Sequence, residues 1–343
     1  MRLAIIGDLH LGRTLYRTTP GEINRFEKVG YSVFNKNIDI ILNSNIDYLI
    51  IAGDIFETAN PSIVALNEFK KGMLRLKDIK TLIVLGNHDF SFKNKRYDCS
   101  SVQSAIEGLG CNIVSFADYS VKYHVDNDYL FVLVPYVYDN RNKIDNFWDE
   151  CKLICSRYTN KHKILITHGV TEYYVDSYPG FENEYVKVPN DITNIFDEVF
   201  IGHIHKPFEY RLNNCHVVSP GALINWMEYT NDTGPLIFDN GKIERIHVDT
   251  PYTIRLDCNE KNINDKLKTI KEYIYKIKYS GNPNMIDNDL FINAKNTALN
   301  LIIDVENIEL VVVNDNKQQN LSSILTWVKE KYPEYYNDFI NLK

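Results

Sequence analysis

The sequence predicts an α/β protein with a layered core of central sheets flanked by helices, followed by a small α+β region at the C-terminal end. Two observations support this fold class. Five short β-branched apolar runs each end on a cluster of Asp, Asn, His and Gly, and segments with helical periodicity lie between them. Continuous apolar runs are typical of strands buried on both faces, as in parallel sheets. Alternating strands and helices then imply right-handed crossovers.

Strands and helices are expected to alternate along most of the chain. Core strands are expected in the runs 3–10, 48–54, 81–89, 163–169 and 198–205, and helices at 22–45, 61–76 and 146–158. Pro61 is expected in the first turn of its helix, where a missing N–H leaves no hydrogen bond unmade. Shorter alternating runs at 121–135 and 208–247 predict antiparallel strands beside the parallel core.

The pattern of apolar and polar residues changes near residue 250, which predicts a domain boundary. We expect a core domain at residues 1–250 and a small α+β domain at residues 251–343. The elements expected in the small domain are a strand at 253–257, a helix at 264–277, a turn-rich break at 280–284, strands at 299–305 and 308–313, and a helix at 321–331.

Composition narrows the class of protein. No apolar run is long enough to span a membrane, and the N-terminal segment lacks the pattern of a signal peptide. The six cysteines contain no CxxC pair, which favours a reduced, cytoplasmic compartment, and Cys151 and Cys155 are expected to pack on one helical face. The formal net charge of -7 argues against a protein that holds nucleic acid mainly by charge.

Polar clusters end the five core strands. Because ligands bind outside the carboxyl ends of strands in open α/β sheets, we expect these clusters to meet on one rim. The residues gathered there are Asp8, His10, Asp54, Asn87, His88, His168, His203 and His205. Carboxylate, amide and imidazole groups suit borderline-to-hard divalent metals. The ligand-type side chains other than His88 are too many for one ion and fit two ions that share a bridging carboxylate.

Plainer interpretations exist for each cluster alone. A single Asp at a strand end is often a helix cap, and a single buried His is often a hydrogen-bonded core residue. Five clusters in order at carboxyl strand ends favour a metal site instead. The segment 7–14 nearly matches a phosphate-binding loop, but it has bulky residues at Leu9 and Leu11, and Arg13 in place of lysine. We therefore do not assign a phosphate-binding loop.

The ordered set Asp-x-His, Gly-Asp, Gly-Asn-His-Asp, His and Gly-His-x-His resembles the calcineurin-like metallophosphoesterases. The flanking motifs resemble those of the SbcD-type nuclease subunit within that superfamily, over residues 8 to about 221. These motifs are GDLHLG, GDIFETANPS, GNHD, THG, GHIH and SPG. Such subunits belong to bacterial and phage recombination complexes and to the eukaryotic double-strand-break repair nuclease. The tail beyond residue 250 matches only in position and size, where these proteins have a small capping domain.

The resemblance implies a set of metal ligands. One metal would bind Asp8, His10, Asp54 and His205, and the second would bind Asp54, Asn87, His168 and His203, so that Asp54 bridges. The family expectation is two Mn²⁺ ions, with Mg²⁺, Fe²⁺ and Zn²⁺ left open.

The resemblance also implies two catalytic residues. His88 would stabilise or protonate the departing ribose oxygen. Glu57 stands where the family orients its catalytic histidine, although relatives usually have Asp or His there. The plainer interpretation of Glu57 is a solvated acid in a loop. Asp89 is expected to be a turn or cap residue.

Three classes of function are compatible with these residues. The first is a metal-dependent DNA nuclease, acting as exonuclease or endonuclease, in an SbcCD-like repair or recombination complex. The second is a phosphoesterase of small nucleotides or phosphoproteins, and the third is a scaffold without catalysis. All ligand positions are retained, which disfavours a scaffold. The word GDIFETA lacks the arginine that protein phosphatases of this superfamily have there, which disfavours a protein phosphatase.

Partners are implied by the same resemblance. Lys93, Lys95 and Arg96 lie among aromatic residues directly after the GNHD word and suit a DNA-gripping loop, although a solvated loop is an equal alternative. The segment 225–229 is aromatic and fits either a groove lining or a core. The C-terminal part is expected to contact an SbcC-like coiled-coil ATPase, and a homodimer is also open. The expected location is the cytoplasm, of the host if the protein is phage-encoded.

Overall fold

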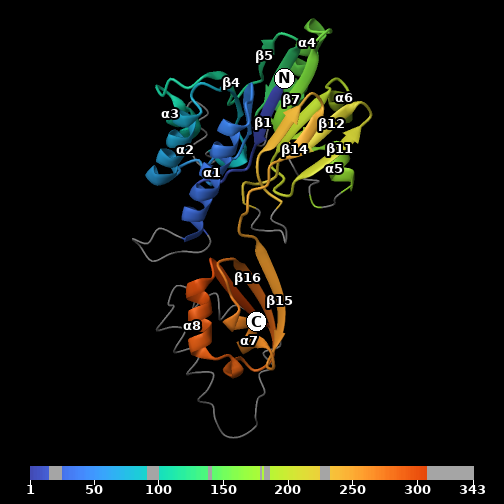
Figure 1. Cartoon of the computed structure of the whole chain (residues 1–343). Coiled ribbons are helices and arrows are strands. Elements are labelled where there is room, and N and C mark those ends of the chain that lie inside the picture. Colours follow the sequence, from blue (N-terminus) through green and yellow to red (C-terminus); the bar gives the residue numbers. More distant parts are fainter. Residues whose placement is uncertain are drawn as a thin grey trace.

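The computed structural model describes residues 1–14, 25–90, 100–137, 141–177, 180, 186–224 and 232–306. Two six-stranded sheets form its centre, helices lie along their outer sides, and a smaller unit follows toward the C-terminal end (Figure 1). The α/β fold class predicted from the sequence is confirmed.

The first sheet has the strand order β14-β13-β1-β2-β3-β4. Its strands are β1 (Arg2–Ile6), β2 (Tyr48–Ala52), β3 (Lys80–Val84), β4 (Ile113–Ala117), β13 (Leu236–Asp239) and β14 (Lys242–Arg245). Strands β1 to β4 run parallel, and β13 pairs antiparallel with β1. The sheet is therefore parallel on the side where the predicted ligands lie.

The second sheet has the order β11-β12-β10-β7-β6-β5. Its strands are β5 (Lys122–Asp126), β6 (Tyr129–Val134), β7 (His162–His168), β10 (Glu198–Gly202), β11 (Phe208–Leu212) and β12 (Cys215–Ser219). The strands β6, β7, β10 and β12 are parallel, while β5 and β11 are antiparallel edge strands. The pair β8 (Val170–Thr171) and β9 (Lys187–Val188) forms a separate small sheet.

Helices flank both sheets. They are α1 (Arg25–Asn43), α2 (Ile63–Arg75), α3 (Ser101–Ile106), α4 (Arg141–Arg157), α5 (Glu172–Ser177), α6 (Asn190–Thr193) and a 3₁₀ turn at Asn87–Asp89. The prediction that Pro61 lies in the first turn of α2 is wrong. The helix begins after Ser62, whose hydroxyl accepts the N–H of Ala65, so Pro61 precedes the cap.

The inner faces of the two sheets form one apolar layer. Tyr48 and Leu82 of the first sheet pack in one cluster with Phe131, Ile166 and Phe200 of the second. All five residues are at most 1% exposed, which explains why their strands have continuous apolar sequences. This layer holds the sheets face to face and brings the carboxyl ends of their parallel strands to the same edge of the molecule.

The C-terminal unit is a three-stranded parallel sheet packed against two helices. Its elements are β15 (Thr253–Asn259), α7 (Ile263–Lys268), β16 (Ile274–Ser280), a 3₁₀ turn at Pro283–Met285, α8 (Asn288–Thr297) and β17 (Asn300–Glu306). The guanidinium of Arg25 at the start of α1 donates to the carbonyl of Asn296, so the two units are in contact.

The predicted helix at 264–277 is wrong. The helix α7 ends at Lys268, and the residues from Ile274 onward form β16, the central strand of the small sheet. Buried Ile277 and Tyr279 alternate with exposed lysines, which is the period of a strand. The helix α8 was not predicted. The strand predicted at 308–313 and the helix predicted at 321–331 lie outside the described residues.

Two expectations from composition can be compared with the structure. Among the described residues, no helix is long and apolar enough to cross a membrane. Cys151 and Cys155 are both buried on α4, and burial raises the pKa of the Cys155 thiol to about 11. Such thiols are unreactive at neutral pH, which agrees with a packing role.

Candidate metal centre

The predicted ligands meet at the shared carboxyl edge of the two sheets. The first sheet contributes side chains that follow β1, β2 and β3, namely Asp8, His10, Asp54 and Asn87. The second sheet contributes side chains that end β7 or follow β10, namely His168, His203 and His205. Because both sheets supply ligands to this edge, residues as much as 195 positions apart in the sequence become neighbours.

Four of these residues have an unusual backbone conformation. The φ angles are 48° at Asp8, 44° at His10, 49° at Asp54 and 99° at His203. Residues with a Cβ rarely adopt positive φ, and clusters of them are typical of functional sites. Main-chain hydrogen bonds between the loops fix this conformation. The N–H of Asp8 donates to Gly53 and the N–H of His10 donates to Asp54, both at 3.0 Å.

Glycines allow the loops to approach this closely. A Cβ at Gly202 would lie 1.9 Å from the carbonyl oxygen of Ala52, so β10 and β2 could not come together with any other residue there. A Cβ at Gly86 would lie 2.3 Å from a carboxylate oxygen of Asp54. The glycines in the words GHIH and GNHD are therefore required by the packing of the site.

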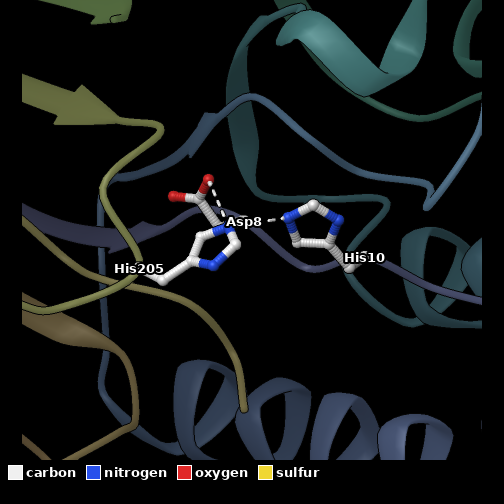
Figure 2. Close-up of side chains that lie close together, drawn as sticks. All are labelled: Asp8, His10 and His205. Carbon is white, nitrogen blue, oxygen red and sulfur yellow. Dashed lines mark hydrogen bonds and ion pairs between the residues drawn. The ribbon is translucent and has the colours of Figure 1, made fainter. Parts of the chain in front are cut away.

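The first group of ligand atoms comes from Asp8, His10 and His205 (Figure 2). The Nε2 atoms of His10 and His205 are 3.1 Å apart, and Nε2 of His205 lies 4.0 Å from Oδ1 of Asp8. Figure 2 shows the two imidazole rings and the carboxylate close together. Oδ2 of Asp54 lies 3.6 Å from Nε2 of His10, which places it beside this group.

The second group is formed by Asn87, His168 and His203. The side-chain oxygen of Asn87 is 3.0 Å from Nε2 of His168 and 2.9 Å from Nδ1 of His203. Oδ2 of Asp54 is 3.4 Å from Nε2 of His168. The carboxylate of Asp54 thus lies between the two groups, at similar distances from both. A group in this position can be shared by two ions.

The donor atoms fit a cation. Nδ1 of His168 faces the carbonyl of Ala52 at 2.8 Å, and because a carbonyl only accepts, this nitrogen must carry a proton. In the neutral ring, Nε2 then presents a lone pair toward the side-chain oxygen of Asn87 and the carboxylate of Asp54. Electron pairs that converge in this way repel one another unless a proton or a metal ion lies among them. Carboxylate, amide and imidazole ligands match a divalent ion of the Mn²⁺ or Zn²⁺ type.

The ionisation of these side chains agrees with this interpretation. Burial alone would raise the pKa of Asp54, but the adjacent His168 outweighs it and holds that pKa well below its usual range. Burial likewise opposes protonation of His168, yet the carboxylate of Asp54 raises the pKa of His168 to about 9. Burial, together with His10, lowers the pKa of His205 to about 2. A proton on His168 therefore balances the negative charge of Asp54, while the ring of His205 stays neutral and keeps a lone pair that can bind a metal ion.

His88 is placed differently from the ligands. Its main-chain N–H donates to the carboxylate of Asp54 at 2.8 Å, and its ring Nδ1 donates to the main-chain carbonyl of Glu57 at 2.6 Å. With Nδ1 protonated, Nε2 is the nitrogen that remains to exchange a proton with a substrate. The ring lies edge-on against His10, with 4.7 Å between the centroids.

The hydrogen bonds of Glu57 differ from those expected. Its carboxylate lies within 4.8 Å of a ring nitrogen of His88, but the group that binds that ring is the main-chain carbonyl. The carboxylate itself accepts from Nδ1 of His10 at 2.9 Å and from Arg13 at 3.0 Å. Burial would raise the pKa of Glu57, but these two partners lower it overall. The expectation that the carboxylate orients His88 therefore does not fit the observed contacts, and a solvated acid does not fit either.

No role was predicted for Arg13. The residue lies three positions after His10, in the segment that nearly matches a phosphate-binding loop, and its guanidinium faces Glu57 instead of an open loop. An arginine so close to a predicted ligand was the only sequence signal for this contact.

Asp89 connects the loops that follow β2 and β3, which contain the predicted ligands Asp54 and Asn87. Its buried carboxylate accepts main-chain N–H groups from Ile55 and Phe56 after β2 and from Gly86 after β3, at 2.9 to 3.3 Å. Burial, with the nearby carboxylate of Asp54, raises the pKa of Asp89 to about 7. The residue belongs to a turn, as expected from the sequence, but its link to the β2 loop had no sequence signal.

The predicted DNA-gripping residues Lys93, Lys95 and Arg96 lie outside the described residues, as does the aromatic segment 225–229.

The chain is similar to known proteins in sequence. The model of the calcineurin-like phosphoesterase family matches residues 1–207. The DNA double-strand break repair protein Mre11 of Methanococcus maripaludis is 27% identical over 292 residues, covering 79% of this chain and 73% of the relative. The protein of the same name from Methanocaldococcus jannaschii is 27% identical over 297 residues, covering 81% and 73%. That from Sulfurisphaera tokodaii is 24% identical over 286 residues, covering 78% and 68%.

Replacing Asp89 tests whether its carboxylate holds the loops after β2 and β3 in place. Asp89→Ala leaves buried N–H groups without an acceptor, and we expect the free energy of unfolding in urea to fall by at least about 2 kcal/mol, since each such group costs about 1–3 kcal/mol. Mn²⁺ binding measured by calorimetry should weaken. Asp118→Ala is the matched control, because the carboxylate of Asp118 accepts from the adjacent Tyr119. Equal effects of the two substitutions would contradict the role of Asp89.

Proposed function

Because the chain belongs to the calcineurin-like phosphoesterase family, we propose that it hydrolyses the phosphodiester bonds of DNA with two divalent metal ions. The observation that carries this proposal is the position of Asp54. Its carboxylate lies 3.6 Å from His10 and 3.4 Å from His168, between two groups of ligand atoms. The Mn²⁺ ion is our choice of metal because the family resemblance implies it, and the mixed oxygen and nitrogen donors are compatible with it.

The assignment of ligands follows the two groups. Asp8, His10 and His205 would hold one ion, and Asn87, His168 and His203 the other, with Asp54 shared. Ions bound there supply positive charge that polarises a phosphodiester and makes a water molecule more acidic. The role of the chain is to keep seven donor groups in place before substrate arrives. Buried Asp8 illustrates this, because both of its carboxylate oxygens accept the main-chain N–H of His203 at 3.0 Å.

His88 is the residue we propose for proton transfer. Its Nδ1 proton is held by the carbonyl of Glu57, so a second proton, which makes the ring an imidazolium, is carried by Nε2, and this is the proton that the residue would donate to a departing ribose oxygen. The residue is partly exposed, unlike the fully buried His168, and a substrate can therefore approach it. General acid catalysis of this kind contributes about 10²–10⁴-fold to a rate.

The choice of DNA as substrate is supported by the relatives. The three archaeal proteins described above are named as DNA double-strand break repair proteins, and each alignment covers at least two thirds of both chains. We also propose, from the resemblance, that residues 251–343 form a small domain that contacts an SbcC-like coiled-coil ATPase, and that the chain forms a homodimer. The charge supports a partner, since residues 251–343 have 12 Lys and Arg against 13 Asp and Glu and so provide little grip on DNA.

One comparative assay tests the substrate. Purified full chain with Mn²⁺ is incubated with linear duplex DNA, single-stranded DNA and a small chromogenic phosphodiester. We expect cleavage of DNA as well as of the small ester. Activity on the small ester alone would contradict a nuclease and favour a phosphoesterase of small nucleotides. No activity on any of the three substrates would contradict the proposed hydrolase activity.

Two substitutions separate metal binding from proton transfer. Asp54→Ala removes the shared carboxylate, so we expect loss of both cleavage and Mn²⁺ binding in calorimetry. His88→Ala should leave Mn²⁺ binding unchanged and lower the cleavage rate at least about 100-fold, because only proton transfer is affected. Loss of Mn²⁺ in the His88 variant would reassign this residue as a ligand. Full turnover of the Asp54 variant would rule out the two-metal site.

The basic segment after the GNHD word gives a third test. We propose that Lys93, Lys95 and Arg96 bind DNA phosphates. Replacing all three by alanine should weaken DNA binding and reduce the slope of log affinity against log salt by about 0.7–0.9 for each phosphate that is no longer neutralised. The control replaces three exposed lysines of the small unit, Lys261, Lys266 and Lys276. An unchanged slope in the first variant would remove this segment from the DNA-binding surface.

A further inference from the structure

A short hydrogen-bonded chain lies on the outer side of His10. Oε2 of Glu57 accepts from Nδ1 of His10 at 2.9 Å and from the guanidinium of Arg13 at 3.0 Å. Both donors therefore converge on a single carboxylate oxygen. The side chains are 1%, 26% and 24% exposed for His10, Glu57 and Arg13, so the carboxylate lies half-buried between a buried ring and a half-buried cation.

The loops that contribute these residues are joined by their backbones. The N–H of Leu11 donates to Ile55 and the N–H of Glu57 donates to Leu11, at 3.0 and 3.1 Å. Leu11 and Phe56 form a parallel β-bridge. The segment that follows β1 is thus paired with the segment that follows β2, and the position of Glu57 relative to His10 is fixed by the main chain.

The hydrogen bond to Glu57 decides which nitrogen of His10 has the proton. A carboxylate can only accept, so Nδ1 of His10 must donate to Glu57. The lone pair of the neutral ring is then on Nε2, which faces His205 at 3.1 Å and Asp54 at 3.6 Å. The ring is too buried for solvent to fix its orientation. In metal sites, a carboxylate on the second nitrogen fixes the tautomer and orientation of the ring and makes it a stronger ligand.

Arg13 completes the arrangement. A half-buried carboxylate without a cation is costly and can turn away toward solvent. The guanidinium binds the same oxygen that faces His10, and so holds it in place. Arg13 comes three residues after His10, so one segment supplies both the ring and the cation that positions the carboxylate partner of that ring.

We propose that Glu57 and Arg13 are a positioning pair for His10, which raises the affinity of the Asp8–His10–His205 group for a divalent ion. This role rests on the proposed function, since it requires that the group binds metal. It is separate from the orientation of His88, because the main-chain carbonyl of Glu57 makes that contact and is retained when the side chain is replaced.

The test is a calorimetric titration of the metal-free full chain with Mn²⁺ alone, without DNA. We expect the wild type to bind two ions. Glu57→Ala should weaken one of the two binding steps by about 10–100-fold and leave the other unchanged. Glu57→Gln keeps an oxygen that can accept from Nδ1 of His10, so its affinity should fall by a smaller factor. Glu68→Ala is the control, because Glu68 also pairs with a basic residue, Lys71 of α2, and its side chain is 20% exposed, close to the 26% of Glu57.

A double substitution separates positioning from general damage. In a His10→Ala background, Glu57→Ala should cause no further fall in Mn²⁺ affinity, because the ring that it positions is absent. Arg13→Ala should weaken the same step as Glu57→Ala by a smaller factor, and the Arg13 and Glu57 substitutions together should be no worse than Glu57→Ala alone. Thermal unfolding of the metal-free variants checks that each is folded.

Three outcomes would overturn different parts of the proposal. Wild-type Mn²⁺ affinity in Glu57→Ala, or in Glu57→Gln should the alanine variant not fold, would overturn the role of Glu57 while leaving the metal site standing. Wild-type affinity in Arg13→Ala would overturn the role of Arg13. A wild-type chain that binds no Mn²⁺ would overturn the metal site, and the positioning role with it.

Discussion

The site depends on one close approach between the two sheets, at Ala52 at the end of β2. Its carbonyl accepts from Nδ1 of His168 on β7 at 2.8 Å, while Gly202 of β10 lies so close that a Cβ there would come within 1.9 Å of the same oxygen. The apolar layer behind this point holds the sheets together. One carbonyl therefore sets both the spacing of the sheets and the orientation of the His168 ring, whose Nε2 faces Asn87 and Asp54.

The buried carboxylates hold the loops together as well as facing the ligand groups. Asp8 comes from the first sheet but accepts the N–H of His203 from the second, and Asp54 accepts the N–H of His88. Asp89 does the same between the loops after β2 and β3. Main-chain donors offset part of the cost of removing a carboxylate from water. The contacts that position the loops are therefore made by the chain itself, as preorganised catalysis requires.

The parts of the fold and the site that could be predicted from sequence are those whose signal is local to strand ends. Each apolar run ends directly on its polar cluster, and the rule that parallel strands present their carboxyl ends together needs no tertiary detail. Features that depend on distant contacts could not be predicted. Glu57 was singled out by its position, but only the pairing of its loop with Leu11 places its carboxylate beside His10. The segment 264–277 was mispredicted for another reason, because a lysine-rich helical start runs into a strand whose alternation is only a few residues long.

The net negative charge of the chain is also found locally, at the edge where the two groups of ligand atoms lie. The described ligand residues and the partners of His10 include three carboxylates, those of Asp8, Asp54 and Glu57. The cations that face them are Arg13 and the protonated His168. Each of these two cations is already paired with a carboxylate, so these side chains alone offer a phosphodiester little positive charge. Two divalent ions would add four positive charges at this edge. Under the proposed function, substrate binding would then depend on metal binding, and the net charge of -7 would no longer argue against DNA as the substrate.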